Sequence, residues 1–452
     1  MKVHFIAVGG SAMHNLAIAL ARKGYQVTGS DDEIFEPSRG RLAKNNLLPA
    51  EEGWNPDHIH EELDAIILGM HAREDNPELK RAQDLGLKIY SYPEFVYEQT
   101  KDKIRIVVGG SHGKTTITSM LLHVMDKLGK PTDYLVGALL EGFDCMVQLS
   151  DAPYIVIEGD EYLSSPIDRR PKFHWYAPHI AMISGIAWDH INVFPTFDNY
   201  IDQFAIFTDK IEQEGHLIYF EGDESIQEVV SKMRIDIQRH PYHTPSYEIK
   251  NGKTFLQTER GAVRLSIFGE HNLQNLNGAR LMLNQIGVSD ADFYSAITDF
   301  KGASKRMEKV AETGISLAYK DFAHSPSKLK ATVKALKEQY PDRKLIACME
   351  LHTFSSLQKS FLPQYAGCMK EADEALVYFS PDVVAHKRLE PLSKEIVEDA
   401  FATDNVSVFT NSNEIVNRLK EKDWDQQNLL LMTSGNFHGL DLNQLAKDLL
   451  EG

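Results

Sequence analysis

One glycine-rich segment, residues 109–116, has the composition and spacing of a phosphate-binding loop. It reads Gly-Gly-Ser-His-Gly-Lys-Thr-Thr, follows an apolar run at 104–108 typical of a buried strand, and precedes a helical pattern at 117–128. Backbone N–H groups at such a helix start bind phosphate, the lysine reaches the β and γ oxygens, and the next hydroxyl ligates Mg²⁺. The longer form of this motif begins with a glycine where this chain has Val108. The match is therefore incomplete, and the prediction depends on the strand and the helix that flank the loop. We expect a nucleoside triphosphate to be held by Gly110, Ser111, His112, Gly113, Lys114, Thr115 and Thr116.

Acidic and histidine side chains follow two further strand patterns. The apolar run at 154–157 leads into Glu-Gly-Asp-Glu at 158–161, and the run at 180–186 leads to Asp189 and His190. Ligands of open α/β sheets bind at the carboxyl ends of strands, where carboxylates can hold Mg²⁺. An acidic turn or a single histidine is by itself more often structural, so this interpretation depends on the phosphate loop in the same block. We expect Glu158 to join Thr115 as a metal ligand and His190 to face the same site.

Two asparagines stand at the start of a helical pattern over residues 276–286. The preceding segment, residues 269–275, places Asn272 and Asn275 three positions apart, so both side chains can lie on one helix face. Asparagine pairs well with adenine because it offers a donor and an acceptor together. Asn272 is an equally good helix cap. Adenine binding and capping both stay open at this point.

The first hundred residues alternate strand and helix patterns. A strand at 3–8, a helix at 13–22 and a strand at 25–29 come first, and further strands are expected at 63–68 and 87–90. This order, with a glycine pair after the first strand, predicts a parallel Rossmann-like sheet. The loop Gly-Gly-Ser-Ala-Met-His at 9–14 lacks a G-x-G-x-x-G fingerprint. It either offers a helix start to a pyrophosphate or is a tight turn and nothing more.

The C-terminal part repeats the α/β pattern. Strands are expected at 316–319, 345–349, 375–378 and 429–432. The connector at 301–306, Lys-Gly-Ala-Ser-Lys-Arg, resembles a hinge that carries cations. We therefore expect three domains, at residues 1–100, 101–307 and 308–452.

Composition excludes some classes of protein. The chain has 452 residues with 48 Lys and Arg against 65 Asp and Glu, a formal net charge of −17, which argues against nucleic acid or an anionic membrane as the main partner. Its 3 cysteines form no C-x-x-C pair and are expected to be reduced. The N-terminal apolar run is too short for a signal segment or a membrane span, so a cytoplasmic protein is expected.

Six motifs in order resemble those of the Mur ligases, the ATP-dependent amide-forming enzymes of peptidoglycan synthesis. They are the glycine loop, Glu158-Gly-Asp-Glu, Asp189-His190, the segment 269–275, Ser304-Lys-Arg306 and Asp321-Phe-Ala-His324. The family's loop has the shorter G-[ST]-x-G-K-T form, which accounts for Val108. The resemblance implies an α/β protein of three domains: a Rossmann-like N-terminal domain that binds a UDP-sugar, a central P-loop ATPase domain, and a Rossmann-like C-terminal α/β domain that binds the amine.

The resemblance also implies roles for individual residues. Lys114 and Arg306 would neutralise the phosphoryl group in transfer, Thr115 and Glu158 would hold one Mg²⁺, and His190 would help to place a second. Adenine and the rest of ATP would meet Asn272, Asn275, Arg306, Asp321 and His324. The nucleotide sugar would lie on Gly9, Gly10, Ser11, Ala12, Met13 and His14, with Asp31 and His71 near it. Polar residues in C-terminal loops, His352 and Asn436 among them, would contact the amine.

Two branches of the family differ in the amine that they join to UDP-N-acetylmuramate. The segment 167–178 and the tyrosine after Glu161 resemble the branch that attaches L-alanyl-γ-D-glutamyl-meso-diaminopimelate, which we expect here. The L-alanine-adding branch is the alternative. A P-loop NTPase that acts on a partner protein, or a nucleotide-gated binding protein, represents a different class. Ser325 stands where the family usually has a second histidine, which leaves one ring fewer near the nucleotide. The C-terminal loops match the family only loosely and leave the amine open, and the oligomeric state is not predicted.

Overall fold

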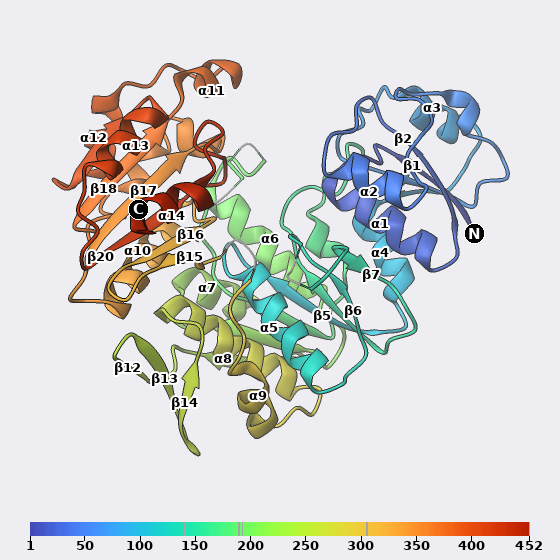
Figure 1. Ribbon diagram of the computed structural model, residues 1–452. Helices are drawn as coiled ribbons and strands as arrows, with labels where there is room; N and C mark the ends of the chain where they lie inside the picture. Colours follow the sequence, from blue (N-terminus) through green and yellow to red (C-terminus); the bar gives the residue numbers. More distant parts are fainter. Residues whose placement is uncertain (140–141, 189, 192, 304–305, 452) are drawn as a thin grey trace. The chain divides into compact units, whose positions relative to one another are not determined.

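The computed structural model describes the chain except for residues 140–141, 189, 192, 304–305 and 452. The chain divides into two compact units. The first comprises Met1–His243 and Asn275–Ile297, and the second comprises Thr244–Gln274 and Thr298–Gly452. Figure 1 shows both units coloured along the sequence. The predicted domain limits near residues 100 and 307 stay a prediction.

The N-terminal part of the first unit is a parallel sheet with strand order β2-β1-β3-β4. The strands are β1 (Lys2–Ile6), β2 (Gln26–Ser30), β3 (Ala65–Leu68) and β4 (Ile89–Ser91). The helices between and after them are α1 (Ser11–Arg22), α2 (Ser38–Lys44), α3 (Pro77–Asp84) and α4 (Tyr92–Thr100), with a short 3₁₀ turn η1 (Pro56–His58). The Rossmann-like sheet expected from the sequence is confirmed.

The central part of the first unit is a seven-stranded sheet of order β11-β10-β9-β5-β8-β6-β7, parallel except for β7. Its strands are β5 (Ile104–Gly109), β6 (Thr132–Leu135), β7 (Val147–Gln148), β8 (Tyr154–Glu158), β9 (Ile180–Ile183), β10 (His216–Phe220) and β11 (Gln238–Tyr242). The accompanying helices are α5 (Lys114–Lys127), η2 (Lys172–Trp175), α6 (Phe197–Asp209), α7 (Glu224–Lys232) and α9 (Asp290–Ile297). Because β5 pairs with both β8 and β9, the carboxyl ends of these three strands lie side by side.

Apolar side chains hold these layers together. A continuous core runs from Phe5 of β1 and Leu16 of α1 to Val107 of β5, Ile157 of β8 and Phe204 of α6. Burial of this kind is the main favourable term in folding, and it fixes the strand ends that carry the polar residues described below.

The second unit contains a three-stranded antiparallel sheet and a six-stranded sheet of order β15-β16-β20-β17-β18-β19. The small sheet is β12 (Tyr247–Lys250), β13 (Lys253–Thr258) and β14 (Gly261–Leu265), and the large one is β15 (Glu308–Glu312), β16 (Leu317–Asp321), β17 (Lys344–Leu351), β18 (Glu374–Phe379), β19 (Val406–Phe409) and β20 (Gln427–Met432). Its helices are α10 (Pro326–Gln339), α11 (Pro381–His386), α12 (Lys394–Phe401), α13 (Ser412–Lys420) and α14 (Leu442–Glu451), with turns η3 (Ser355–Leu357) and η4 (Leu362–Tyr365). Helix α8 (Glu270–Asn284) begins in this unit, and its residues from 275 on belong to the first.

The small antiparallel sheet was not predicted, although the sequence carries a signal for it. Asn251 and Gly252 form the turn between β12 and β13 and have φ values of 52° and 67°. An Asn-Gly pair between alternating strands is the strongest short-range sign of a β-hairpin. Hydrogen bonds from Tyr247 to Glu338 (2.7 Å) and from Thr254 to Gln339 (3.0 Å) attach this sheet to α10.

Candidate active site

The predicted phosphate loop connects β5 to α5, as the sequence analysis expected. Gly110 has φ = 125°, and a Cβ there would lie 2.3 Å from the Ser184 hydroxyl. Gly113 has φ = 80°, and a Cβ there would lie 2.5 Å from Asn275 Oδ1. Both positions therefore require glycine. The N-cap residue of α5 is Gly113, which has no side chain to cap the helix, so the first-turn N–H groups can serve a phosphate.

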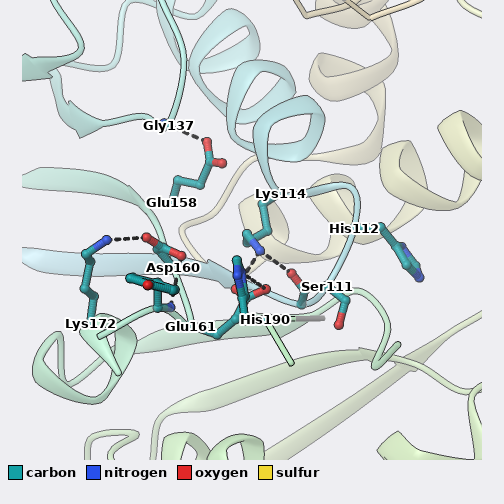
Figure 2. A network of polar contacts seen from close by, with 12 residues as sticks. Ser111, His112, Lys114, Gly137, Glu158, Asp160, Glu161, Lys172 and His190 are labelled. Carbon is teal, nitrogen blue, oxygen red and sulfur yellow. Dashed lines mark hydrogen bonds and ion pairs between the residues drawn. The ribbon is translucent and has the colours of Figure 1, made fainter. Parts of the chain in front are cut away.

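Lys114, at the start of α5, is held by two acceptors. Its Nζ donates to the Gly110 carbonyl oxygen at 2.7 Å and to Glu161 Oε2 at 2.6 Å (Figure 2). Burial disfavours the ammonium, but the negative charges of Glu161 and Asp160 outweigh it and hold the pKa of Lys114 above its usual range. The lysine is thus a positive charge at every physiological pH, as neutralisation of a phosphoryl group requires.

Glu158, at the end of β8, lies beside the hydroxyl of Thr115. Thr115 Oγ1 donates to Glu158 Oε1 at 2.9 Å, and the Gly137 N–H donates to Oε2 at 2.8 Å. Burial raises the pKa of the Glu158 carboxyl, so a cation beside it would restore the charged form. One carboxylate and one hydroxyl, completed by phosphate oxygens and waters, form a typical Mg²⁺ site. The pair fits the metal ion expected from the sequence.

Glu161 connects the phosphate loop to α6, a role that the sequence analysis did not assign. Its Oε1 accepts from the Tyr200 hydroxyl at 3.1 Å, and Tyr200 shares a 2.9 Å hydrogen bond with Ser111. Ser111 Oγ in turn accepts from the Ala187 N–H at 2.9 Å. Glu161 is 1% exposed, so its ion pair with Lys114 lies inside the protein. Tyr200 is far away in sequence, and its part in this network could not be read from spacing.

Asp160 is paired with Lys172 from η2. Lys172 Nζ lies 2.5 Å from Asp160 Oδ2, as Figure 2 shows. Although burial favours the neutral acid, the charges of Lys172 and Lys114 lower the pKa of Asp160 to about 2. The acidic turn after β8 therefore holds three carboxylates with three different partners.

His190 lies beside the same acidic turn, and its place in a metal or ligand site stays a prediction. Its Nε2 lies 3.9 Å from Glu161 Oε1, and its ring meets the Tyr162 ring edge-on with centroids 5.2 Å apart. The backbone of His190 has φ = 52°, an uncommon conformation for a residue other than glycine. Asp189 was predicted together with it and lies outside the described residues.

The remaining residues of the loop face β9. Ser184 donates to the His112 carbonyl oxygen, and a Cβ on Gly185 would lie 2.2 Å from His112 Nε2. The His112 ring therefore packs against the chain just after β9. Thr116 is buried in the first turn of α5.

The two asparagines of α8 are placed differently. Asn275 contacts the phosphate loop at Gly113, within the first unit. Asn272 belongs to the second unit, and its side-chain amide donates to the Phe268 carbonyl oxygen at 2.9 Å. Asn272 is the third residue of α8 and donates to a carbonyl, whereas a helix cap accepts from a backbone N–H, so this hydrogen bond does not support the capping alternative. Adenine binding stays a prediction for both.

The N-terminal turn is arranged around Asp31. Asp31 Oδ2 accepts from the Gly9 N–H at 2.7 Å, and a Cβ on Gly10 would lie 3.5 Å from His71 Nδ1. Burial raises the pKa of Asp31 to about 6, against the stabilising hydrogen bond from Gly9. Met13 and His14 are buried in α1, and Ser11 and Ala12 form its first turn, so the turn presents mainly backbone groups to a ligand.

A second polar group lies in the second unit, where β16 ends. Asp321 accepts from the N–H groups of Met307 and Ala323, each at 2.6 Å. Burial raises the pKa of Asp321, although the nearby positive charge of Arg306 opposes this. The Arg306 guanidinium lies 5.1 Å from the centre of the Phe322 ring, and His324 Nδ1 contacts the Phe322 carbonyl oxygen at 2.9 Å. Ser304 and Lys305, quoted with Arg306 above, are outside the described residues.

A buried carboxylate that the sequence analysis missed lies at the ends of β17 and β20. Glu350, 3% exposed, accepts from the Thr433 hydroxyl and from the Phe437 N–H at 2.9 Å. His352 Nδ1 lies 3.5 Å from Glu350 Oε1. Asn436 accepts from the Gly439 N–H at 3.0 Å in the adjoining turn. Within the described residues, the buried Ser434 hydroxyl has no hydrogen-bond partner, so this corner can accept a polar ligand.

Two absences can be stated for the described part of the chain. None of its helices is long and apolar enough to cross a membrane. It also holds no group of three or more His, Cys, Asp or Glu side chains arranged for a metal ion.

Family models match nearly the whole chain. Residues 2–103 match the Mur ligase family catalytic domain, residues 108–283 the Mur ligase middle domain, and residues 305–436 the Mur ligase glutamate ligase domain.

Curated relatives that are named UDP-N-acetylmuramate–L-alanine ligases match most of the chain. A UDP-N-acetylmuramate–L-alanine ligase of Caldicellulosiruptor bescii is 30% identical over 83% of this chain and 83% of its own length. One of Carboxydothermus hydrogenoformans is 26% identical over 99% of this chain and 97% of its own.

Solved structures of both branches are similar. A UDP-N-acetylmuramate:L-alanyl-γ-D-glutamyl-meso-diaminopimelate ligase from Neisseria meningitides is 25% identical, with a TM-score of 0.60 over 66% of this chain and 98% of that one. A murein peptide ligase from Psychrobacter arcticus is 24% identical, with a TM-score of 0.64 over 100% of this chain and 98% of its own. A UDP-N-acetylmuramate–alanine ligase from Thermotoga maritima is 18% identical, with a TM-score of 0.71 over 100% and 98%. The last two likenesses concern the fold, and they agree with the predicted three-domain architecture.

Proposed function

The chain belongs to the Mur ligase family and is an ATP-dependent amide ligase, and from this premise we propose that it joins the carboxylate of UDP-N-acetylmuramate to an amine through an acyl phosphate. The observation that carries the proposal is the network at the ends of β5 and β8. It places a charged lysine, a hydroxyl–carboxylate pair and an open helix start around one point. These groups are what phosphoryl transfer requires, because its catalysis is mainly positioning and charge neutralisation.

In this proposal each group at the phosphate loop has a separate task. The N–H groups of residues 110–116 bind the phosphates, and Lys114 leaves Glu161 to meet the β and γ oxygens. Thr115 and Glu158 hold Mg²⁺, which neutralises phosphate charge when bound, and His190 stands where it can serve a second metal ion. Asn275 adjoins the loop and would meet the nucleotide, and Asn272, Arg306, Asp321 and His324 are assigned to ATP by family resemblance.

The nucleotide sugar is assigned to the N-terminal sheet. The start of α1 carries N–H groups that can bind a diphosphate, and Asp31 fixes the Gly9 N–H beside them. Gly9, Gly10, Ser11, Ala12, Met13 and His14 form this turn, and His71 adjoins it.

Two amines have support. L-alanine is favoured by the curated relatives, which cover most of this chain and carry that activity in their names. The tripeptide L-alanyl-γ-D-glutamyl-meso-diaminopimelate, expected from the segment 167–178, has support from that segment and from the Neisseria meningitides structure. We give L-alanine the greater weight and keep the tripeptide as the second candidate.

One experiment tests the function and the choice of amine together. The purified chain is given ATP, MgCl₂ and UDP-N-acetylmuramate, with L-alanine or the tripeptide added in separate reactions, and ADP release is measured. We expect ADP only when the nucleotide sugar and the accepted amine are both present. Steady ATP hydrolysis without nucleotide sugar would instead indicate an NTPase that acts on another partner.

A further inference from the structure

The segment after the acidic turn folds back along it. Leu163 pairs with Pro171, the Lys172 N–H donates to the Tyr162 carbonyl oxygen at 2.9 Å, and the Phe173 N–H donates to that of Asp160 at 3.1 Å. Residues 171–173 therefore run antiparallel beside residues 160–163. This backbone pairing fixes the origin of the Lys172 side chain next to the phosphate site.

Three cations stand close together in this segment, and they are placed differently. Arg170 is held by Asp168 at 2.8 Å and lies over the Trp175 ring at 4.1 Å. Arg169 and Arg170 both line a cavity of about 390 Å³, whose other wall includes Gln203 and Ile206 of α6. Lys172 instead extends to Asp160, as Figure 2 shows.

Lys172 is also connected to the rest of the site through an aromatic ring. Its Nζ lies 5.7 Å from the centre of the Tyr162 ring, and that ring meets His190 at 5.2 Å. His190 and Lys114 both contact Glu161. The Glu161 carboxylate contacts Lys114 of the phosphate loop directly. Among the described residues, the Lys172 ammonium is connected to the loop only through other side chains.

We propose that Lys172 binds the carboxylate of the incoming amine substrate. The inference rests on the proposed function, in which the amine attacks an acyl phosphate held near Lys114. An ammonium has three N–H donors, and Asp160 accepts one of them. The side chains of Lys172 and Asp160 are 20% and 39% exposed, so a ligand can reach the pair. The inference concerns the free carboxylate nearest the attacking nitrogen, which is the α-carboxylate of L-alanine itself and the glutamyl α-carboxylate in the tripeptide.

The order of groups in the site distinguishes the amine's carboxylate from that of the sugar. The muramoyl carboxylate has to meet the γ-phosphate, on the Lys114 side of the network. An amino acid carries its carboxylate one carbon away from the attacking nitrogen, so that group lies beyond the reacting centre. Asp160 and Glu161 would repel a carboxylate there, and Lys172 is the cation that counters this charge.

Four variants test the inference, with Arg169→Gln as the matched control because Arg169 is a cation of the same segment that faces the cavity. The KM values for ATP, nucleotide sugar and amine are measured for each. Lys172→Gln should raise the KM for the amine about 10- to 100-fold, the loss expected for one hydrogen bond to a charged group. The other two KM values should change less than about threefold. Lys172→Arg should restore most of the amine affinity, and Arg169→Gln should leave all three values unchanged.

The fourth variant, Asp160→Asn, separates substrate binding from a structural role. If Asp160 only holds Lys172 until the amine arrives, its loss should leave the KM for the amine unchanged or lower it. If the pair is structural, Asp160→Asn and Lys172→Gln should have the same effect, and this result would overturn the inference.

A substrate analogue provides an independent readout. An analogue in which the carboxylate nearest the attacking nitrogen is replaced by a carboxamide lacks that negative charge, so the wild type should prefer the free acid while Lys172→Gln should lose most of this preference. Lys172→Arg keeps the positive charge and should therefore retain the preference for the free acid. If Lys172→Gln does not fold, loss of this preference in Lys172→Arg overturns the inference. An unchanged preference in Lys172→Gln overturns the inference alone. Absence of wild-type turnover with either amine overturns the proposed function as well.

Discussion

Lys114 and Glu161 form a buried pair whose two members have different roles. Replacing Lys114 by alanine should reduce kcat about 100-fold or more, because charge on the transferring phosphoryl group is no longer neutralised. The same change leaves Glu161 buried without its cation, which should lower the free energy of unfolding by about 3–5 kcal/mol. The double variant Lys114→Ala/Glu161→Gln should regain most of that stability and none of the turnover. Urea denaturation and ADP-release assays of the same preparations check both statements, and recovery of turnover in the double variant would contradict the role given to Lys114.

Glu158 is assigned to the metal ion and Glu161 to the lysine, so their amide variants should fail in different ways. Glu158→Gln keeps the shape of the side chain and an acceptor for the Gly137 N–H but loses the negative charge. Half-maximal activity should therefore need at least about tenfold more Mg²⁺. Glu161→Gln should lower kcat with little change in the Mg²⁺ requirement. Titration of each variant with MgCl₂ tests the assignment. A shifted Mg²⁺ requirement in Glu161→Gln instead of Glu158→Gln would mean that the metal ligand has been misassigned.

Asp31 should make the stability of the N-terminal sheet depend on pH in a predictable direction. Its pKa is raised to about 6 in the folded chain by burial, while an unfolded aspartate has a pKa of about 3.9. Between these values the folded chain binds more protons than the unfolded one, so the contribution of Asp31 to stability falls as pH rises from about 4 to 6. Asp31→Asn keeps an acceptor for the Gly9 N–H and does not ionise. Relative to the wild type, this variant should therefore gain stability as pH rises through that window in urea denaturation curves. A constant difference across pH would rule out the raised pKa.

At the scale of elements, the phosphate loop is the part most fully specified by sequence. The strand, the glycine loop and the helix are where the pattern predicted them, because Lys114–Lys127 continues an apolar periodicity that starts directly after the glycines. The expected strands of the C-terminal block are also confirmed, since β16, β17, β18 and β20 are apolar runs bounded by turn residues. The spacing of motifs could not predict which side chains pair with one another in the folded chain. Tyr200 and Glu161, like Thr433 and Glu350, become neighbours only when the sheets form, and Lys172 meets Asp160 only when the chain folds back after the acidic turn.

The shape of this loop can be tested with a pair of glycines. Gly113 and Gly129 both have positive φ, 80° and 63°, but a Cβ would collide with Asn275 at Gly113 and meets nothing within 4 Å at Gly129. Gly129→Ala should cost about 1–2 kcal/mol of stability from backbone strain alone and leave ATP binding unchanged. Gly113→Ala adds displacement of Asn275 and should also weaken ATP binding about tenfold or more. Nucleotide affinity measured by calorimetry distinguishes the two, and equal affinities would mean that the contact between Gly113 and Asn275 does not shape the site.

At the scale of the whole molecule, the N-terminal and central sheets of the first unit have to present two substrates to one reaction. Asn15 of α1 joins them: it is 0% exposed, and its Oδ1 accepts from the Met146 N–H at 2.9 Å while its Nδ2 donates to the Ser11 carbonyl oxygen at 2.7 Å. Nothing in the sequence distinguishes this asparagine from a surface one. The same boundary carries an exposed ion pair, Arg22 with Asp144 at 2.8 Å.

These two connections across one boundary should differ in energy, and this difference provides the last test. Asn15→Ala leaves the Met146 N–H without a buried partner and should lower the free energy of unfolding by about 1–3 kcal/mol. Arg22→Ala removes only an exposed pair and should cost about 0–1 kcal/mol. Because Asn15 lies in the helix whose first turn is assigned to the nucleotide sugar, Asn15→Ala should also raise the KM for that substrate while Arg22→Ala leaves it unchanged. Chemical denaturation and steady-state kinetics of both variants measure this. Equal costs in the two variants would mean that the sheets are held together by apolar packing alone and that Asn15 adds nothing specific to their arrangement.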